Sequence, residues 1–88
     1  MGIINGAVTA STTPTAFTFS GLGSDTVRVR FRNHGPEVTY FGNASVTAST
    51  GYPLAVADSY EWPIRLYSGE LYYVVETGTS DLRYTGVA

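Results

Sequence analysis

Alternation of apolar and polar residues is the clearest pattern along this chain. Between Thr26 and Arg32, the apolar residues Val27, Val29 and Phe31 alternate with arginines. Successive side chains of a β-strand point to opposite faces, so this segment is predicted to be a strand with one apolar face and one cationic face. No stretch repeats its apolar residues at helical spacing. The chain is therefore predicted to be all-β.

Seven further strands are predicted from residue type and turn signals. They are Gly6–Ala10, Thr15–Phe19, Val38–Phe41, Ala44–Ala48, Ser59–Tyr67, Glu70–Glu76 and Leu82–Val87. Turns rich in glycine, proline, asparagine and serine separate them, at 21–25, 33–36, 42–43, 49–53, 68–69 and 77–80. About eight short strands at this spacing favour a small antiparallel two-sheet sandwich, jelly-roll or immunoglobulin-like, with a small barrel as the competitor.

Three local features add detail to this prediction. Ser68-Gly69 is predicted to join a two-strand hairpin, because such a pair suits the turns that match strand twist. Pro63 has no backbone N–H and belongs at an edge or a bulge. The segment Leu71–Val75 is apolar on both faces, so its strand is either central or covered by another chain.

The length of 88 residues predicts one sandwich domain over residues 6–88, preceded by a flexible arm at 1–5. A domain of this size buries only about 60–65% of its unfolded surface, so support from partner subunits is expected. No apolar run approaches the roughly 20 residues of a membrane helix, and the first four residues are too short and uncharged for a secretory signal. No membrane association is expected.

Charge and composition favour a protein partner. The formal net charge is −2, which argues against general nucleic-acid binding. The chain has no lysine and five arginines, and protein interfaces enrich arginine and aromatic residues. The stripe of Arg28, Arg30 and Arg32 could pair with acidic groups of a partner, or it could simply keep one strand face solvated.

The side chains that usually carry catalysis are poorly represented. His34 is the only histidine and lies in a turn sequence, where a solvated side chain is the ordinary outcome. Cysteine is absent, which leaves no thiolate ligands for a metal. No motif singles out a catalytic pair among the carboxylates Glu61, Glu70, Glu76 and Asp81. The chain is therefore predicted to be non-enzymatic, without cofactor or metal.

Aromatic residues offer a second candidate surface. Trp62 could join Tyr60, Tyr67, Tyr72, Tyr73 and Tyr84 in a platform for sugar rings, or these side chains could form the core or a subunit interface. Trp62 and Tyr72 are accordingly predicted, with Arg28, Arg30 and Arg32, to contact a partner. A glycan remains an alternative ligand.

The stretch from Val38 to Leu54 consists of a strand ending in Phe41-Gly42, the segment Val46-Thr47-Ala48-Ser49, and then Gly51-Tyr52-Pro53-Leu54. In this it resembles small bacteriophage virion proteins. The order of the flanking strands also matches, so the resemblance covers roughly residues 7 to 87.

The resemblance implies a capsid cement or decoration protein that stabilises the head by binding between capsid subunits. It implies the major capsid protein or other virion proteins as partners, a location on the capsid surface after synthesis in the host cytoplasm, and no catalytic residues. We expect a homo-oligomer, with a trimer favoured, because closed rotational symmetry lets small subunits share a core. The alternative is a carbohydrate- or receptor-binding module of a head or tail fibre.

Overall fold

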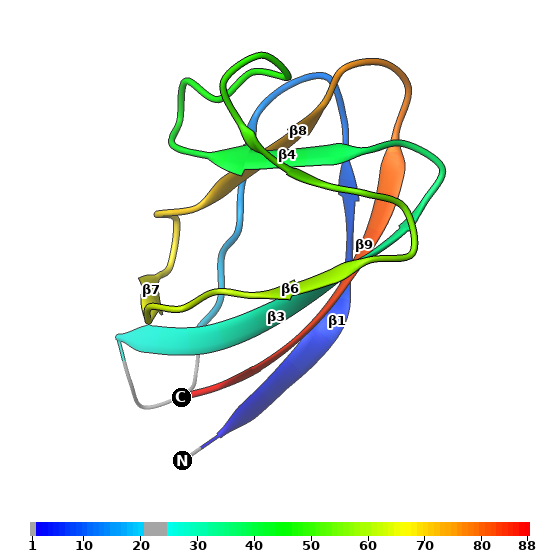
Figure 1. Cartoon of the computed structure of the whole chain (residues 1–88). Coiled ribbons are helices and arrows are strands. Elements are labelled where there is room, and N and C mark those ends of the chain that lie inside the picture. The colour runs from blue at the N-terminus through cyan, green and yellow to red at the C-terminus, as the bar shows by residue number, and fades with distance from the viewer. Residues whose placement is uncertain (1, 21–24) are drawn as a thin grey trace.

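Two antiparallel sheets pack face to face in the computed structural model, which describes residues 2–20 and 25–88 (Figure 1). Sheet A has the order β1 (Ile3–Ala10), β9 (Ser80–Val87), β3 (Thr26–Gly35) and β6 (Ser59–Glu61), with β7 (Leu66–Tyr67) also paired to β3. Sheet B has the order β2 (Thr15–Ala16), β8 (Tyr72–Val75), β4 (Thr39–Gly42) and β5 (Tyr52–Leu54). The predicted all-β two-sheet sandwich is confirmed. The described part has no helix capable of crossing a membrane.

The strand order identifies the kind of sandwich. Because β6 and β7 both pair with β3, they can be counted as one interrupted strand. With that count, sheet A holds the first, eighth, third and sixth strands, and sheet B holds the second, seventh, fourth and fifth. This alternation between the two sheets is the order of a jelly roll, the first of the two sandwich topologies that the sequence left open.

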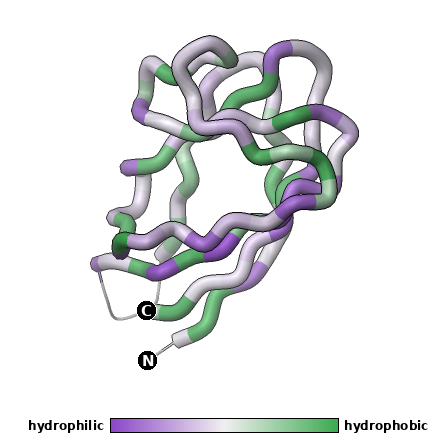
Figure 2. The backbone as a smooth tube through the Cα atoms, viewed as in Figure 1, coloured by the Kyte–Doolittle hydropathy of each residue, from purple (hydrophilic) through white to green (hydrophobic). Residues whose placement is uncertain are grey.

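Strand β3 forms as predicted and extends beyond the predicted end. Its apolar residues Val27, Val29 and Phe31 are completely buried, whereas the arginines between them are exposed. Figure 2 shows the corresponding alternation of purple and green along this strand. The strand continues to Gly35, so His34 lies in the strand, beside a bulge in the β3–β9 ladder, and its side chain is exposed.

The core lies between the sheets and is largely aromatic. The ring of Phe31 has its centroid 5.1 Å from those of both Phe17 and Phe41, so a side chain of sheet A contacts one from sheet B. Tyr84 packs edge-on against Phe17, with 4.9 Å between the ring centroids. These rings, together with buried valines and leucines, form one continuous cluster.

The predicted strand Ser59–Tyr67 is interrupted. It divides into β6 and β7 on either side of residues 62–65, where Pro63 cannot donate a ladder hydrogen bond. Trp62 N still donates to Val29 O at 3.0 Å, so the chain stays beside β3 across the interruption. Pro63 thus lies in an interruption of the strand at the edge of sheet A, which agrees with the predicted place at an edge or a bulge.

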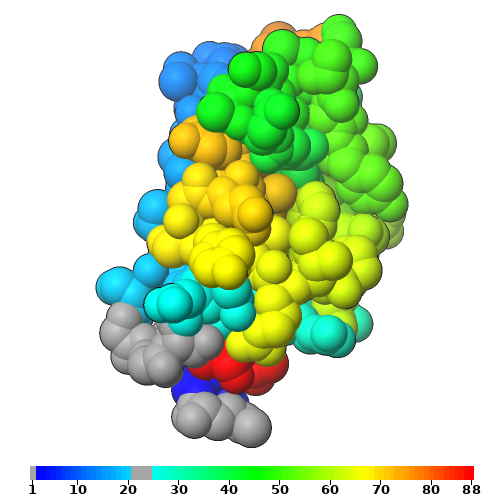
Figure 3. Space-filling model, turned by 90° about the vertical axis from the view of Figure 1, so that its left-hand side faces the viewer, coloured from blue at the N-terminus to red at the C-terminus, as the bar shows by residue number. Residues whose placement is uncertain are grey.

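The predicted hairpin around Ser68-Gly69 is wrong. The turn itself forms, since Glu70 N donates to Tyr67 O. However, β7 pairs with β3 in sheet A, and β8 pairs with β2 and β4 in sheet B. The turn therefore carries the chain from one sheet to the other. Figure 3 shows this yellow segment spread across the middle of one face of the molecule.

The predicted strand Ala44–Ala48 is also wrong, and β5 was not predicted. Asn43 Oδ1 accepts from Ser45 N, and hydroxyl and backbone groups of Thr47 and Thr50 bond to each other. Such local side-chain bonds compete with a sheet ladder. Val46 is buried, and a Cβ built at Gly42 would lie 2.8 Å from its Cγ2, so this loop packs closely onto sheet B.

The loop explains the apolar outer face of β8. Strand β8 is central in sheet B, which is one of the two predicted outcomes. Its outward residue Val74 is only 4% exposed, and it lines a hollow together with Val46 and the neighbouring loop residues. A segment of the same chain therefore covers this face.

Near the N-terminus, the structure differs from the predicted flexible arm. Ile3, Ile4 and Asn5 belong to β1 and pair with Val87, Gly86 and Thr85 of β9. This pairing uses backbone groups, so it does not depend on strand-forming side chains, and the sequence of residues 1–5 did not predict it. The predicted turn at 21–25 lies outside the described residues except for Asp25.

Candidate partner-binding face

Four arginines share the outer face of sheet A, which we call the arginine face. Arg28, Arg30 and Arg32 project from β3, and Arg83 projects from the neighbouring strand β9. The register places Arg30 opposite Thr85 and Arg32 opposite Arg83. The structure thus brings together the three arginines predicted from the sequence and adds a fourth.

Two of these arginines are held by carboxylates. Arg30 Nη2 lies 3.3 Å from Glu61 Oε1 on β6, and Arg83 Nη2 lies 2.9 Å from Asp81 Oδ2 on its own strand. The hydrogen bond from Arg83 lowers the pKa of Asp81 and raises the pKa of Arg83. The pair is therefore ionised at neutral pH, and its contribution to stability is lost as the pH falls through the lowered pKa of Asp81.

The other two arginines have no partner in the part of the chain that the structure describes. Within residues 2–20 and 25–88, Arg28 and Arg32 form neither an ion pair nor a side-chain hydrogen bond. In addition, Arg32 stands directly across from Arg83, and like charges opposite each other in an antiparallel ladder destabilise the sheet. Both observations leave cationic groups that an external anion would satisfy.

Shallow hollows lie between the arginine side chains. One of about 270 Å³ is lined by Arg28, Arg30, Glu61 and Val87, among others, and a smaller one of about 210 Å³ lies between Arg30, Arg32 and Arg83. Neither is an enclosed cleft. The guanidinium groups around them can bind carboxylate groups of a facing surface with two parallel hydrogen bonds.

The charges of the molecule are segregated. The arginine face carries four arginines with only two carboxylates. The rest of the chain carries Arg65 against Asp25, Glu37, Asp58, Glu70 and Glu76. A net charge of −2 therefore conceals a cationic face on an otherwise acidic body.

Comparison with protein-family models, curated proteins and solved structures gave no significant match.

Trp62 does not join the arginine face. It is half-buried where the edges of the two sheets approach each other, and its ring packs edge-on against Phe41 and Tyr60. Its indole Nε1 is buried and has no hydrogen-bond partner among the described residues. Trp62 mainly closes the side of the core.

Tyr72 lies on a third surface, the outer face of sheet B. It is half-buried on β8, opposite Ala16 on one side and Gly42 on the other. The five residues predicted to contact a partner therefore occupy three separate places, and only the arginines form one group. The contact predictions for Trp62 and Tyr72 stay predictions.

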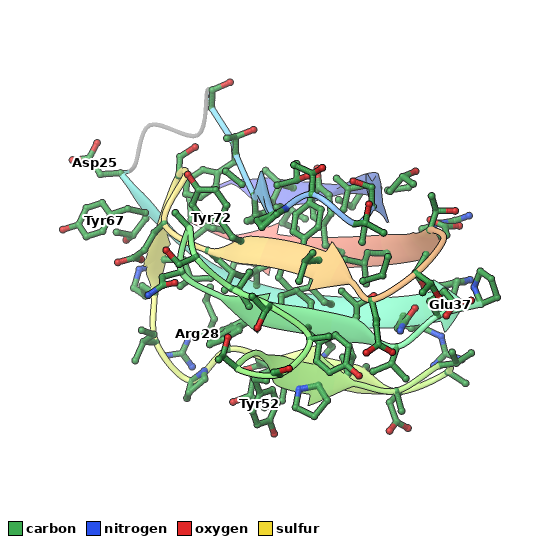
Figure 4. All side chains as sticks on the ribbon, turned by 90° about the horizontal axis from the view of Figure 1, so that it is seen from above. Asp25, Arg28, Glu37, Tyr52, Tyr67 and Tyr72 are labelled. Carbon is green, nitrogen blue, oxygen red and sulfur yellow. The ribbon has the colours of Figure 1, made fainter. Side chains whose placement is uncertain are left out.

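Sequence analysis missed two exposed features. Arg83 was not grouped with the stripe, although it alternates with Leu82 and Tyr84 and so has the pattern of an outward residue on β9. Tyr52 is 52% exposed and lies 5.0 Å from Tyr60 between ring centroids, at the edge formed by β5 and β6. Figure 4 shows it at this side of the sandwich.

The carboxylates considered for catalysis do not assemble into a group. Glu61 and Asp81 bind arginines, and Glu70 Oε1 accepts a hydrogen bond from Tyr67 N in the turn between the sheets. In the part of the chain that the structure describes, no three histidine, cysteine or acidic residues are close enough to hold a metal ion.

Proposed function

We propose that this chain is a non-enzymatic accessory protein of a bacteriophage virion, which decorates the head by docking its arginine face on an acidic surface of the capsid. The observation that carries the proposal is the pair of arginines, Arg28 and Arg32, which have no partner among the described residues and lie on an exposed sheet face. Exposed charges of this kind steer association and fix the register of a docking surface.

The strand order supports the same proposal by analogy. Jelly rolls are common in viral capsid and lectin domains, which are the two settings that the sequence resemblance and the aromatic residues suggested. A fold alone does not assign a function, so the charged face has the greater weight. On a capsid, many copies that each bury a modest contact would stabilise the shell through summed binding energy.

The test is rebinding to phage heads stripped of accessory proteins. The wild-type protein is expected to bind them in a manner that weakens as salt is added, since the contacts are charged. Replacement of Arg28, Arg30 and Arg32 by serine is expected to weaken binding by about a hundredfold or more, because each charge-assisted hydrogen bond contributes about 1.5–3 kcal/mol. Affinity is measured by co-sedimentation, and electron microscopy locates the protein on the particle.

Arg65→Ser is the matched control. Arg65 is the one arginine outside the arginine face. It donates hydrogen bonds to the hydroxyl and the carbonyl oxygen of Thr26. Its replacement is matched to each single replacement within the triple variant, because it removes one positive charge, and it should leave binding nearly unchanged. Equal binding by the wild-type and triple variants would exclude the arginine face as the docking surface. Wild-type binding to tails alone, or to no part of the particle, would exclude head decoration.

A glycan-binding module is the second candidate, favoured by the exposed ring of Tyr52 beside Tyr60 and Trp62. Trp62 is the only tryptophan, so its fluorescence reports on this edge alone. If the edge stacks on sugars, oligosaccharides from the bacterial surface should shift its emission, and Tyr52→Ala should abolish the shift. Under the decoration proposal, the emission stays constant across the oligosaccharide panel, and Tyr52→Ala leaves rebinding to heads unchanged.

A further inference from the structure

Strand β1 is an unusually open sheet edge. Among the described strands it pairs only with β9, and it is eight residues long, whereas the other edge strands have two or three. The opposite edges are protected in the usual way, by Pro53 in β5 and by Pro63 between β6 and β7. The segment Ile3–Ala10 contains neither a proline nor a charged residue.

The burial pattern agrees with an edge that lacks a neighbour. The inward residues of β3 are completely buried, but Ile4 and Val8 of β1 remain partly exposed although they pack against the core. On the outward side, Ile3 is 72% exposed. A further strand beside β1 would cover these side chains.

The direction of the free backbone groups follows from the β1–β9 ladder. Ala88 N donates to Gly2 O, which shows that residue 2 directs its carbonyl toward β9. In an antiparallel pair, residues alternate in the side to which their N–H and C=O groups point. The even-numbered residues of β1 therefore bond to β9, and Ile3, Asn5, Ala7 and Thr9 present their backbone groups to the open side.

We propose that the open edge of β1 binds β1 of a second copy of this chain, antiparallel and centred on Gly6. In this register Ile3 faces Thr9 of the copy and Asn5 faces Ala7, so all four open residues find partners that point toward them. The pairing would form about eight backbone hydrogen bonds. The twofold axis would pass between the two Gly6 residues and join the two A sheets into one.

A second copy fits this edge better than an unrelated strand for three reasons. The register covers the whole of β1, and it places Ile4 opposite Val8, a favourable pairing of β-branched side chains. No charges are brought opposite each other, because β1 has none. Glycine at position 6 suits the close approach of the two backbones at the axis. A side chain would not fit there, because a Cβ built at Gly6 would lie 2.8 Å from the Tyr84 hydroxyl.

Antiparallel pairing of identical strands generates a closed dimer. The proposal therefore replaces the trimer expected from the sequence. It does not depend on the decoration role, although the two arginine faces would lie on the same side of the joined sheet. A dimer would then offer two such faces to one acidic surface and gain avidity.

The first test is the oligomeric state by sedimentation velocity, at concentrations up to the millimolar range. The wild-type protein should form dimers. Asn5→Lys places like charges near the axis and should weaken dimerisation by about tenfold or more. Thr18→Lys adds the same charge at an exposed position outside the strands and should leave it unchanged. A wild-type protein that stays monomeric or forms trimers would overturn the proposal, as would dimerisation unaffected by Asn5→Lys.

Proline gives an independent test of the hydrogen bonds. Ala7→Pro removes an N–H on the open side while the bonds of β1 to β9 remain, so the circular dichroism spectrum should be preserved and the dimer lost. If this variant fails to fold, Asn5→Lys with its matched control still decides the question.

The register is tested by mixing variants. Asn5 faces Ala7 of the copy, so a mixture of Asn5→Lys with Ala7→Glu should restore the dimerisation that each variant alone weakens. Pairing centred on Ala7 would instead set Asn5 against Thr9. Stronger rescue by Thr9→Glu than by Ala7→Glu would therefore overturn the register centred on Gly6, and rescue by neither would overturn strand pairing at this edge.

Discussion

Replacement of Phe31 by alanine is expected to lower the free energy of unfolding by about 3–5 kcal/mol, since removal of a buried aromatic ring loses its transfer free energy and leaves a cavity. Phe31 is completely buried, and its ring lies against Phe17 and Phe41 and near Tyr84. These neighbours come from both sheets and from the segment that links them. The cavity would open in the middle of the sandwich, where the surrounding strands cannot easily collapse into it.

Urea denaturation followed by circular dichroism measures the effect. Tyr67→Ala is the matched control, because Tyr67 is an aromatic residue that is 59% exposed, and its replacement should change stability by less than about 0.5 kcal/mol. Small domains have only about 5–15 kcal/mol of stability in total. A loss for Phe31→Ala no greater than that for Tyr67→Ala would show that this ring is not central to the core.

The elements predicted correctly are those whose signal is contained in the strand itself. In β3, strict alternation over Val27, Val29 and Phe31 fixes both the strand and its two faces. The class of the fold follows from many such short segments with turns between them. The strand partners do not follow, because pairing in a jelly roll joins residues far apart in the chain, as when Phe31 lies opposite Tyr84.

The errors have the same origin. Ser68-Gly69 forms a local turn, but the strands on either side of it do not pair with each other. One pairs with β3 in sheet A and the other with β4 in sheet B. The segment 44–48 has strand-like residue types, yet the hydroxyls of Thr47 and Thr50 and the amide of Asn43 satisfy its backbone locally. Local propensity does not reveal such competition.

For the candidate site too, the sequence predicted the part that lies within one strand and not the part that depends on strand pairing. The stripe of Arg28, Arg30 and Arg32 belongs to one strand, so its common face is evident from alternation alone. Arg83 joins it only through the β3–β9 pairing, and Trp62 and Tyr72 are separated from it by the arrangement of the sheets. A contact face that spans several strands therefore requires the topology as well as the sequence.

The arginine face and the open edge have a common physical property. Each leaves strong interacting groups without partners in the described chain: guanidinium groups in the first case and backbone N–H and C=O groups in the second. Solvent can satisfy both at modest cost, so neither prevents the monomer from folding. Both favour assembly, and they point in different directions, one along the normal of sheet A and the other within its plane.

Asn33→Leu is expected to reduce the free energy of unfolding by about 1–3 kcal/mol, through a buried polar network rather than a cavity. Asn33 is completely buried. Its Nδ2 donates to Glu37 O and Leu54 O, both at 2.8 Å, and its Oδ1 accepts from Gly35 N and Ser80 Oγ. One side chain thus links β3 and β9 of sheet A to β5 of sheet B.

Leucine has the same number of side-chain heavy atoms but can make none of these bonds. The Ser80 hydroxyl can still donate to Glu37 O, which lies 2.8 Å away, and Leu54 stays paired with Thr39 in the β4–β5 ladder, so Gly35 N is the group left without its partner. Each buried, unpaired group costs about 1–3 kcal/mol, from which the expected range follows. The loss is measured by the same urea titration.

Asn43→Leu is the matched control for this substitution. Asn43 also has one side-chain hydrogen bond to a backbone N–H, at 2.9 Å, but it is exposed, so water can replace the bond and the loss should stay below about 1 kcal/mol. Equal effects of the two substitutions would mean that the network around Asn33 contributes no more than a surface turn. A large difference would identify Asn33 as the polar link that holds the two sheets in register at this end of the sandwich.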